Sequence, residues 1–212
     1  MLNILYEDNH LIVVEKPYNM PMNPDDSKDL DLLTAIKQYI KEKYHKPNNV
    51  YLGLVHRLDR PVGGVCVFAK TSKAAGRLSD QIRLRTFSKT YLAVVEDHHL
   101  KNQDQFQDYL LKNKAKNMVT VNPKGKLAKL SYEVINRNDK YAKVLIHLET
   151  GRPHQIRVQF ASRNHPLYGD QRYNKNAKVG QQIALYANSI SFNHPTTKER
   201  ITFTSQPKNF IL

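Results

Sequence analysis

One stretch of the sequence limits the fold more than any other, because a charged loop is followed by a nearly all-apolar segment. Residues Gly64 to Ala69 are nearly all apolar and rich in β-branched side chains, which is typical of a central strand. The preceding His56-Arg57-Leu58-Asp59-Arg60 places one carboxylate between two arginines. Neighbouring positive charge favours the ionised form of a carboxylate. The sequence therefore predicts a buried sheet with an ionised aspartate on a loop that enters one of its strands.

Asp59 has two interpretations on this local pattern. An ionised carboxylate in a basic setting can attack an electron-poor carbon or stabilise a developing cation. A surface salt-bridge cluster would produce the same pattern, because structural ion-pair networks also surround acids with positive charge. The pentapeptide alone does not decide between a catalytic and a structural aspartate.

Short apolar runs separated by turn residues predict an α+β chain in which strands outnumber helices. Apolar residues at helical spacing predict an amphipathic helix over 32–44, Thr71 or Ser72 can cap a second helix, and a third is expected over 154–161. Residues 98–117 are polar and ambiguous, and we interpret them as an insertion or a poorly determined segment. Short turns between strands favour one antiparallel sheet in a single domain, 1–212. The expected strands are 2–6, 10–15, 64–69, 91–95, 118–121, 130–135, 141–148, 183–187, 189–192 and 201–204.

The charge balance indicates a polyanionic partner. The chain has 33 Lys and Arg against 19 Asp and Glu, a formal net charge of +14, and basic residues dominate Lys112 to Lys129. Such a surface suits nucleic acid or an acidic membrane. Membrane binding would place the charge on an amphipathic helix, and the expected helix over 32–44 has apolar positions sufficient only for docking on a core. Nucleic acid is therefore the preferred partner.

Several classes of function are disfavoured by what the sequence lacks. A single cysteine, Cys66, excludes an internal disulfide and a cysteine-based zinc cluster. Nine histidines occur without an H-E-x-x-H pattern, so we expect no metal. The sequence has no G-x-x-x-x-G-K-[ST], so we expect no nucleotide cofactor. We also expect no membrane association and a cytoplasmic location, since there is no apolar run of about 18 residues and no secretory signal.

Five stretches, in the right order and spread over nearly the whole chain, resemble the pseudouridine synthases of the RluA type. The resemblance begins near residue 1, with no room for the S4-type RNA-binding domain that many relatives carry, so target recognition would fall on the catalytic domain. The stretches are Leu11-Ile12-Val13-Val14-Glu15-Lys16-Pro17, HRLDRPVGGVCVFAKT (56–71), Lys89-Thr90-Tyr91, TGRPHQIR (150–157) and HPLYGD (165–170).

The resemblance implies both a fold and a reaction. The fold is a single pseudouridine synthase-type catalytic domain, with a mixed, mostly antiparallel sheet, flanking helices and a central cleft. The reaction is the isomerisation of specific uridines in ribosomal or transfer RNA to pseudouridine. It imports no electron or group, so no cofactor is expected, and we expect the enzyme to act as a monomer.

The resemblance also implies roles for three residues. Asp59 is the catalytic carboxylate, Tyr91 stacks on the target base, and Arg157 is the cation that keeps the aspartate ionised and aimed. For Tyr91 the alternative is an ordinary half-buried strand tyrosine, the commonest fate of such a residue. A ring beside a flipped base would add roughly 1–3 kcal/mol of stacking, which favours the functional interpretation.

Further basic residues are candidates for RNA contact. Arg60 could equally be structural, and a buried structural histidine is the safer interpretation of His154, which is expected one helical turn from Arg157. His56 is interpreted as a residue that braces the loop. The candidate RNA-contacting residues are Arg57, Arg60, Lys89, Arg152 and His154.

One departure from the family pattern keeps a second function open. The family usually has Thr-Ser-Gly where this chain has Pro61-Val62-Gly63-Gly64, which removes hydroxyls that brace the loop. The alternative is therefore a non-catalytic RNA-binding or ribosome-assembly protein on the same fold. Retention of Asp59, Tyr91 and Arg157 together favours the enzyme. A hydrolytic glycosidase would need two catalytic carboxylates, and no second acid lies in a comparable motif.

Overall fold

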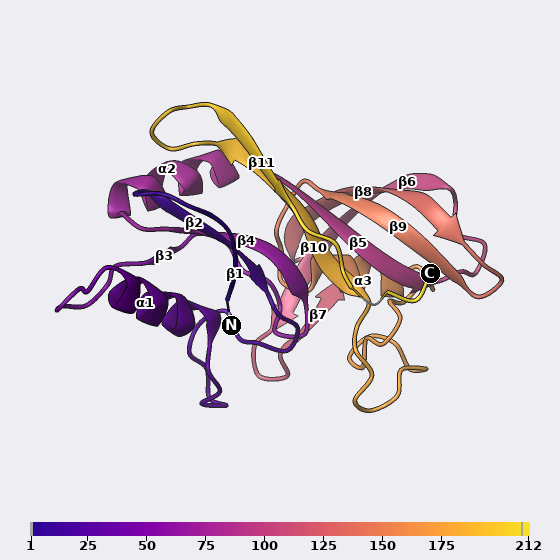
Figure 1. Cartoon of the computed structure of the whole chain (residues 1–212). Coiled ribbons are helices and arrows are strands. Elements are labelled where there is room, and N and C mark those ends of the chain that lie inside the picture. The colour runs from indigo at the N-terminus through magenta and orange to yellow at the C-terminus, as the bar shows by residue number, and fades with distance from the viewer. Residues whose placement is uncertain (1, 209) are drawn as a thin grey trace. The chain divides into compact units, whose positions relative to one another are not determined.

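The computed structural model describes residues 2–208 and 210–212. The chain forms two compact units, which are described separately. Unit 1 contains Met1–Ser88 and Ala187–Gln206, and unit 2 contains Lys89–Tyr186 and Pro207–Leu212. The elements in both units are those of an α+β protein with a largely antiparallel sheet (Figure 1), so the predicted fold class is confirmed. The single-domain organisation and the central cleft stay predictions.

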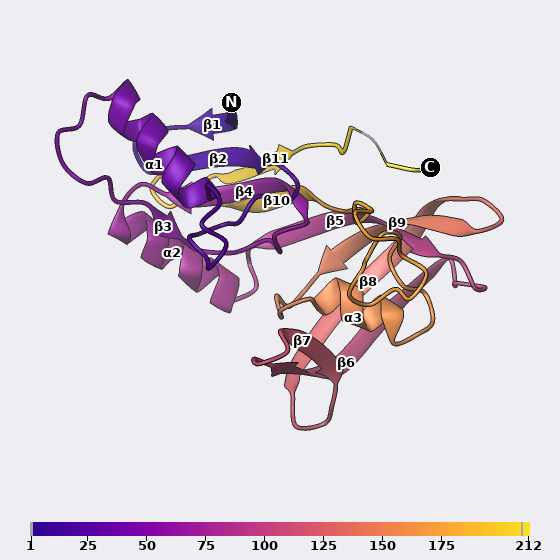
Figure 2. The same ribbon diagram turned by 90° about the horizontal axis from the view of Figure 1, so that it is seen from below.

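Unit 1 is a small sheet with a helix on each face. Strand β2 pairs antiparallel with β1 and β4, β3 pairs with β4, and β11 pairs with β10. Figures 1 and 2 both show α1 and α2 on opposite sides of β2 and β4. The elements are β1 (Asn3–Glu7), β2 (Leu11–Lys16), α1 (Leu32–Lys43), β3 (Gly53–Leu54), β4 (Gly63–Ala69), α2 (Ser72–Arg83), β10 (Leu185–Asn193, from Ala187 on in this unit) and β11 (Arg200–Thr204).

The sequence pattern of β4 explains this arrangement. Every residue of β4 is buried, as the apolar run predicted. Alternate residues along β2 and β4 pack against α2, which contributes Leu78 to their core, and the remaining residues face the other side. Cys66 lies on β4 and is fully buried, and burial raises the pKa of its thiol to about 12.

The helices of unit 1 begin at side-chain caps. The carboxylate of Asp31 accepts a hydrogen bond from the Thr34 amide at 2.9 Å and caps α1. Thr71 Oγ1 accepts from the Ala74 amide at 3.2 Å, so Thr71 rather than Ser72 caps α2. Such caps satisfy amides that have no partner within the helix.

Unit 2 is an antiparallel sheet covered by one short helix. Strand β5 (Ser88–Glu96, from Lys89 on in this unit) pairs with β9 (Tyr141–Leu148), β9 with β8 (Lys126–Arg137), β8 with β6 (Gln103–Asn113), and β6 with β7 (Met118–Val121). Helix α3 (Gln155–Ala161) packs on β6 and β7 (Figure 2). The rings of Phe106, Tyr132 and Phe160 lie at centroid distances of 5.0 to 5.2 Å and form part of the core of unit 2.

Three predictions about elements need correction. The ambiguous segment 98–117 is largely strand β6, in which Phe106 and Leu110 are buried and most other residues are exposed. The two strands expected over 183–187 and 189–192 are one strand, β10. The third helix begins at Gln155, so His154 lies before it. Within the described residues, no helix is long and apolar enough to cross a membrane.

Candidate active site

The loop that carries Asp59, residues 56–62, is fixed through its main chain. The Val62 amide donates to the Asp59 carbonyl at 3.0 Å and closes a turn. Lys16, only 1% exposed, donates from Nζ to the Arg60 carbonyl at 2.9 Å. The same ammonium also donates to the carbonyls of Met20 at 2.7 Å and Pro17 at 3.0 Å. One buried cation therefore ties the loop to the end of β2.

Steric crowding explains why residue 64, just after this loop, is a glycine. Gly64 has a φ of +121°, a conformation that L side chains rarely adopt. A Cβ there would lie 2.3 Å from the carbonyl oxygen of Ala187 on β10. The main chain of the loop exit therefore lies directly against its neighbour, and only glycine fits.

Lys16 also shapes the electrostatics beside Asp59. Burial lowers the pKa of Lys16 to about 8, while nearby Asp59 raises it and Arg60 lowers it. The charged form is nevertheless the one that can donate to all three carbonyls, because an ammonium has three N–H groups. Asp59, a half-buried residue, thus has a buried cation near it in addition to the two arginines that flank it in the sequence.

His56 braces the loop, as expected. Its Nε2 accepts a hydrogen bond from the Val67 amide of β4 at 3.1 Å. An imidazole nitrogen that accepts is unprotonated, so His56 is the neutral tautomer with its proton on Nδ1. Its ring also lies 5.6 Å from that of Phe87. These contacts fix the start of the loop and give His56 a structural role.

The two arginines around Asp59 differ in their surroundings. Arg57 is exposed. Arg60 binds the segment before α1, through an ion pair with Asp29, a longer one of 3.6 Å with Asp25 and a hydrogen bond of 2.9 Å to Ser27. These contacts favour the structural interpretation of Arg60 that the sequence left open.

In unit 2, the predicted partner cation Arg157 is buried and bound to a carboxylate that the sequence did not single out. Arg157 lies on α3 and is 5% exposed. Its Nε and Nη2 donate to the two carboxylate oxygens of Asp170 at 2.8 and 2.7 Å. The guanidinium also lies over the ring of Tyr173, with Cζ 5.2 Å from the ring centroid. Asp170 is the last residue of the HPLYGD stretch. The sequence therefore pointed to the motif but did not predict that Asp170 binds Arg157.

The turn before α3 is held by side-chain bonds to β8. Gln155 Nε2 donates to the carbonyl of Lys129 at 3.0 Å, and its Oε1 accepts from Thr150 Oγ1 at 2.8 Å and from the Arg152 amide at 3.0 Å. Arg152 Nε donates to the Leu127 carbonyl at 2.8 Å. The Thr-Gly-Arg-Pro-His-Gln stretch thus forms a fixed turn that delivers Arg157 to its position.

We expected His154 to lie one helical turn from Arg157, and this expectation is wrong. It is the residue before α3 and has a φ of +50°, in the left-handed region. Its Nδ1 lies 2.7 Å from the hydroxyl oxygen of Tyr173, which also accepts a hydrogen bond from the Val119 amide at 2.9 Å. The prediction of a structural histidine agrees with this bond.

Tyr91 and Lys89 lie two residues apart on β5. Tyr91 is 7% exposed and pairs with Ile146 of β9. Lys89 Nζ lies beside Gly151, where an added Cβ would be 3.2 Å from it. Burial lowers the pKa of Lys89, and within residues 2–208 and 210–212 no group pairs with its ammonium. A cation that is partly buried and unpaired suits an anionic ligand.

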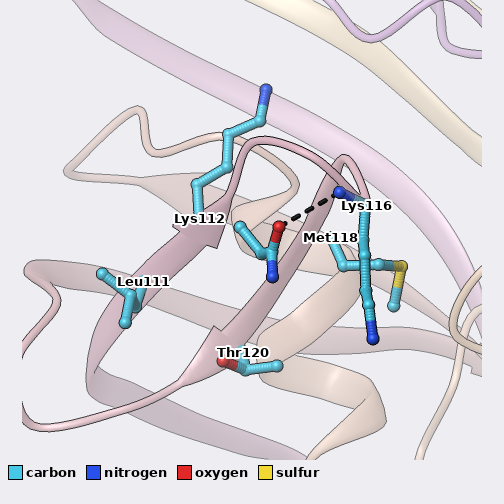
Figure 3. A pocket seen from close by; sticks show the side chains of 6 residues that line it. Leu111, Lys112, Lys116, Met118 and Thr120 are labelled. Atoms are coloured by element: carbon cyan, nitrogen blue, oxygen red, sulfur yellow. Dashed lines mark hydrogen bonds between the residues drawn. The ribbon is translucent and has the colours of Figure 1, made fainter.

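The β6–β7 hairpin carries a basic hollow (Figure 3). The walls come from both strands, and the Lys116 amide donates to Asn113 Oδ1 at 3.1 Å and fixes the turn. The residues that line the hollow are Leu111, Lys112, Asn113, Lys116, Met118 and Thr120.

Each unit thus gathers a different part of the predicted site. Unit 1 holds Asp59 with Lys16, and unit 2 holds Arg157 with Asp170 and Tyr173. Lys16, Asp170 and Tyr173 support these residues, and none of the three was assigned a role from the sequence. No group of His, Cys, Asp or Glu within the described parts of the chain could hold a metal ion.

The fold matches that of two solved human proteins. Human RNA pseudouridylate synthase domain containing 1 superposes with a TM-score of 0.78 and 22% identity, over 98% of this chain and 84% of that one. For human RNA pseudouridylate synthase domain containing 4 the TM-score is 0.80 at 20% identity, with 97% and 89% covered. The chain therefore has the pseudouridylate synthase fold.

The sequence matches agree with the fold. A family model described as RNA pseudouridylate synthase matches residues 10–162. A relative from Bacillus subtilis named uncharacterized RNA pseudouridine synthase YhcT is 32% identical over 94% of this chain and 67% of its own length. Ribosomal large subunit pseudouridine synthase D of Haemophilus influenzae is 32% identical, over 99% and 69%. Synthase C of Buchnera aphidicola (subspecies Baizongia pistaciae) is also 32% identical, over 98% and 67%.

The chain spans about two thirds of the length of these relatives. It belongs to the RNA pseudouridylate synthase family, the isomerases that act on uridine in RNA. The predicted family is therefore confirmed, and the match covers the region that carries the His56–Arg60 loop and helix α3.

Proposed function

We propose that the chain converts specific uridines of ribosomal RNA to pseudouridine, with Asp59 as the catalytic carboxylate. The observation that carries the proposal is the loop 56–62, whose main chain is fixed by Lys16 and by a turn, with Asp59 half-buried on it. A nucleophilic or charge-stabilising role needs a carboxylate that is held rigidly in place.

The reaction requires only groups that the chain supplies. The bond between N1 of uracil and C1′ of the ribose breaks, the base turns, and C5 bonds to C1′ while the C5 proton is lost and N1 gains one. The target nucleotide must leave its stack, which costs a few kcal/mol. An ionised Asp59 acts at the sugar during this exchange, and the Tyr91 ring supports the turned base by stacking. Arg157 supplies the positive charge that favours the ionised carboxylate.

The polyanionic substrate is bound by basic residues outside this chemistry. Lys89 is the best supported of the predicted RNA contacts, because its ammonium is partly buried and has no partner among the described residues. Arg57 is exposed and available to phosphates. The lysines of the β6–β7 hollow add a basic surface. Arg152, Arg60 and His154 complete the predicted set, although each also has an intramolecular bond.

Ribosomal RNA is preferred to transfer RNA as the target, because the names of two of the similar proteins refer to the large ribosomal subunit. We further propose that the enzyme acts as a monomer in the cytoplasm.

The affinity for RNA should fall steeply as the salt concentration rises, because basic side chains that neutralise phosphates release counterions from the RNA.

The substitution Asp59→Asn tests the proposal. Asparagine keeps the shape and hydrogen-bonding capacity of the loop residue but cannot act as a nucleophile or carry the charge. Tritium release from C5-labelled uridines in host RNA should fall to background, while RNA affinity stays within a few-fold. Asp26→Asn, a change at an exposed aspartate of the same unit, is the matched control and should leave tritium release unchanged.

Two outcomes would contradict the proposal in different ways. If wild-type protein releases no tritium from any host RNA yet binds it, the chain is a non-catalytic RNA-binding or ribosome-assembly protein. If wild type is active and Asp59→Asn keeps a comparable rate, Asp59 is not the catalytic carboxylate.

A further inference from the structure

The ion pair between Arg157 and Asp170 is closed to solvent. The exposed fractions of the two side chains are 6% and 0%. Both carboxylate oxygens are used, since Oδ2 accepts from Arg157 Nε at 2.8 Å and Oδ1 accepts from Arg157 Nη2 at 2.7 Å. Oδ1 also accepts from the amide of Arg172 at 3.1 Å, which fixes the carboxylate relative to its own loop. A fork of this kind sets the plane and the direction of a guanidinium as well as its place.

A second contact fixes the face of the same guanidinium. Tyr173 lies beneath it at 5.2 Å, and the Tyr173 hydroxyl is bound by the Val119 amide at 2.9 Å and lies 2.7 Å from His154 Nδ1. The ring itself is therefore anchored to β7 and to the turn before α3. Groups of unit 2 therefore hold Arg157 along one edge and across one face.

Another pair at the same helix provides a comparison. Arg163, two residues beyond the end of α3, binds Asp108 of β6 through Nη1 at 2.9 Å and Nη2 at 3.2 Å. Its side chain is 31% exposed and that of Asp108 is 12% exposed. Both pairs fasten the α3 region, yet only the Arg157 pair is sealed from solvent. Fastening the helix does not require a sealed pair, so the burial at Asp170 needs another explanation.

We propose that Asp170 is a positioning residue for the reaction, which holds the Arg157 guanidinium in the one orientation that serves turnover. The inference rests on the proposed function, in which Arg157 acts on the catalytic carboxylate. Asp170 binds two of the five N–H donors of Arg157. Because the guanidinium is planar and rigid, fixing these two donors also fixes the direction of the other three. A displacement of about 1 Å in such a group can cost about 100-fold in rate.

The variant Asp170→Asn breaks the fork at almost constant volume. The amide oxygen can still accept from Arg157, but the amide NH₂ faces an N–H and cannot accept. The single-turnover rate at saturating RNA should fall by about 10- to 100-fold. The dissociation constant for RNA should stay within about 3-fold, since Asp170 is buried away from phosphates. A change in rate without a change in affinity separates positioning from a general loss of structure.

The matched control is Asp108→Asn, which breaks the Arg163 fork in the same unit. It should lower the thermal midpoint, yet leave the single-turnover rate within about 2-fold of wild type. A fall in rate as large as that of Asp170→Asn would overturn the inference, because any loosening of the α3 region would then suffice.

A double-mutant cycle tests whether Asp170 acts through Arg157. Lysine in Arg157→Lys keeps the charge but cannot form the fork, and its rate should be low. Adding Asp170→Asn should then lower the rate by less than about 3-fold, because residues that act as one unit are not additive. A second full loss would show that Asp170 acts independently of Arg157 and would overturn the inference.

A measurement on wild-type protein keeps the inference testable if Asp170→Asn does not fold. In labelled protein, the Nε–H of Arg157 should exchange with solvent much more slowly than that of Arg163. Equal exchange rates would show a mobile guanidinium and overturn the inference. An active wild type that fails these tests leaves the proposed function standing. A wild type without turnover overturns the proposed function, and the positioning role with it.

Discussion

The loop around Asp59 and the helix around Arg157 are held by opposite means. In unit 1, Lys16 binds main-chain carbonyls, one of which belongs to the loop, so the side chains of the loop are not part of the bond. In unit 2, Asp170 binds the Arg157 side chain itself. A main-chain anchor tolerates changes in the residues it holds, whereas a side-chain fork requires both partners. The loop can therefore vary in sequence at residues held only through their main chain, whereas the pair cannot.

This difference explains the departure at Pro61 and Val62. The expected loss of bracing hydroxyls is offset by bonds that need no hydroxyl, namely the Val62 amide to the Asp59 carbonyl and Lys16 to the Arg60 carbonyl. Val62 is 2% exposed, so its side chain contributes packing in place of a polar contact. The departure is therefore compatible with a rigid loop.

The largest effect is expected from separating the two members of the fork. Arg157→Met leaves the Asp170 carboxylate buried without a cation, which should lower the free energy of unfolding by about 3–5 kcal/mol. The double variant Arg157→Met/Asp170→Leu removes both charges and should recover most of that loss. Urea denaturation measures both. Turnover should be lost in both, so an active double variant would contradict the role of Arg157.

Lys16→Met tests the main-chain anchor. Three partly buried carbonyl oxygens lose their donor, and acceptors left unpaired should lower the free energy of unfolding by about 3 kcal/mol. Lys41→Met, at an exposed lysine of α1, is the control and should change the free energy of unfolding by less than about 0.5 kcal/mol. If denaturant titrations give equal values for the two variants, Lys16 does not hold the loop.

Glu7 provides a side-chain anchor in unit 1 that can be titrated. Burial raises the pKa of Glu7, but hydrogen bonds from Lys43, Lys70, Tyr44 and Tyr39 outweigh it and lower the pKa from 4.5 to about 2. A lowered carboxylate pKa contributes stability above pH 4.5 that is lost as the pH falls towards 2. Both lysines are partly solvated, so we expect about 1 kcal/mol at most.

The check is unfolding of wild type and Glu7→Gln between pH 7 and 2.5. Wild type should lose its advantage over the variant across that window. A difference between the two proteins that stays constant with pH would exclude Glu7 as the titrating group.

The smallest effect is expected at Asp29. Its ion pair with Arg60 joins side chains that are 55% and 41% exposed, and exposed pairs contribute roughly 0–1 kcal/mol. Asp29→Ala should lower stability by less than about 0.5 kcal/mol and leave tritium release within about 2-fold. A large loss of turnover would mean that the Arg60 side chain, and not only its carbonyl, positions the loop.

Sequence patterns predicted the elements well where burial is periodic. Strand β4, helix α1 and the cap of α2 follow directly from apolar spacing and side-chain chemistry. Strand β6 was missed because only Phe106 and Leu110 face its core, and two apolar residues four apart do not give strand alternation. His154 was placed in a helix because a left-handed backbone at a non-glycine residue has no sequence signal.

The site was only half predictable for a related reason. Asp59 and Arg157 lie in recognisable motifs, but their supports act at a distance along the chain. Lys16 reaches a carbonyl 44 residues away, and Asp170 binds an arginine 13 residues away. Contacts of this kind are made by tertiary structure, and neither periodicity nor local charge records them.

The single buried thiol gives the protein a natural probe of local unfolding. Cys66 is enclosed on β4, with Sγ 3.7 Å from the Val14 carbonyl, and its pKa of about 12 leaves almost no thiolate at neutral pH. Alkylating reagents attack the thiolate, so modification requires unit 1 to open. Because the chain has one cysteine, the rate of labelling reports the opening of that unit alone, without any introduced probe. Mass spectrometry of the single Cys66 adduct can thus measure how often the sheet of unit 1 opens.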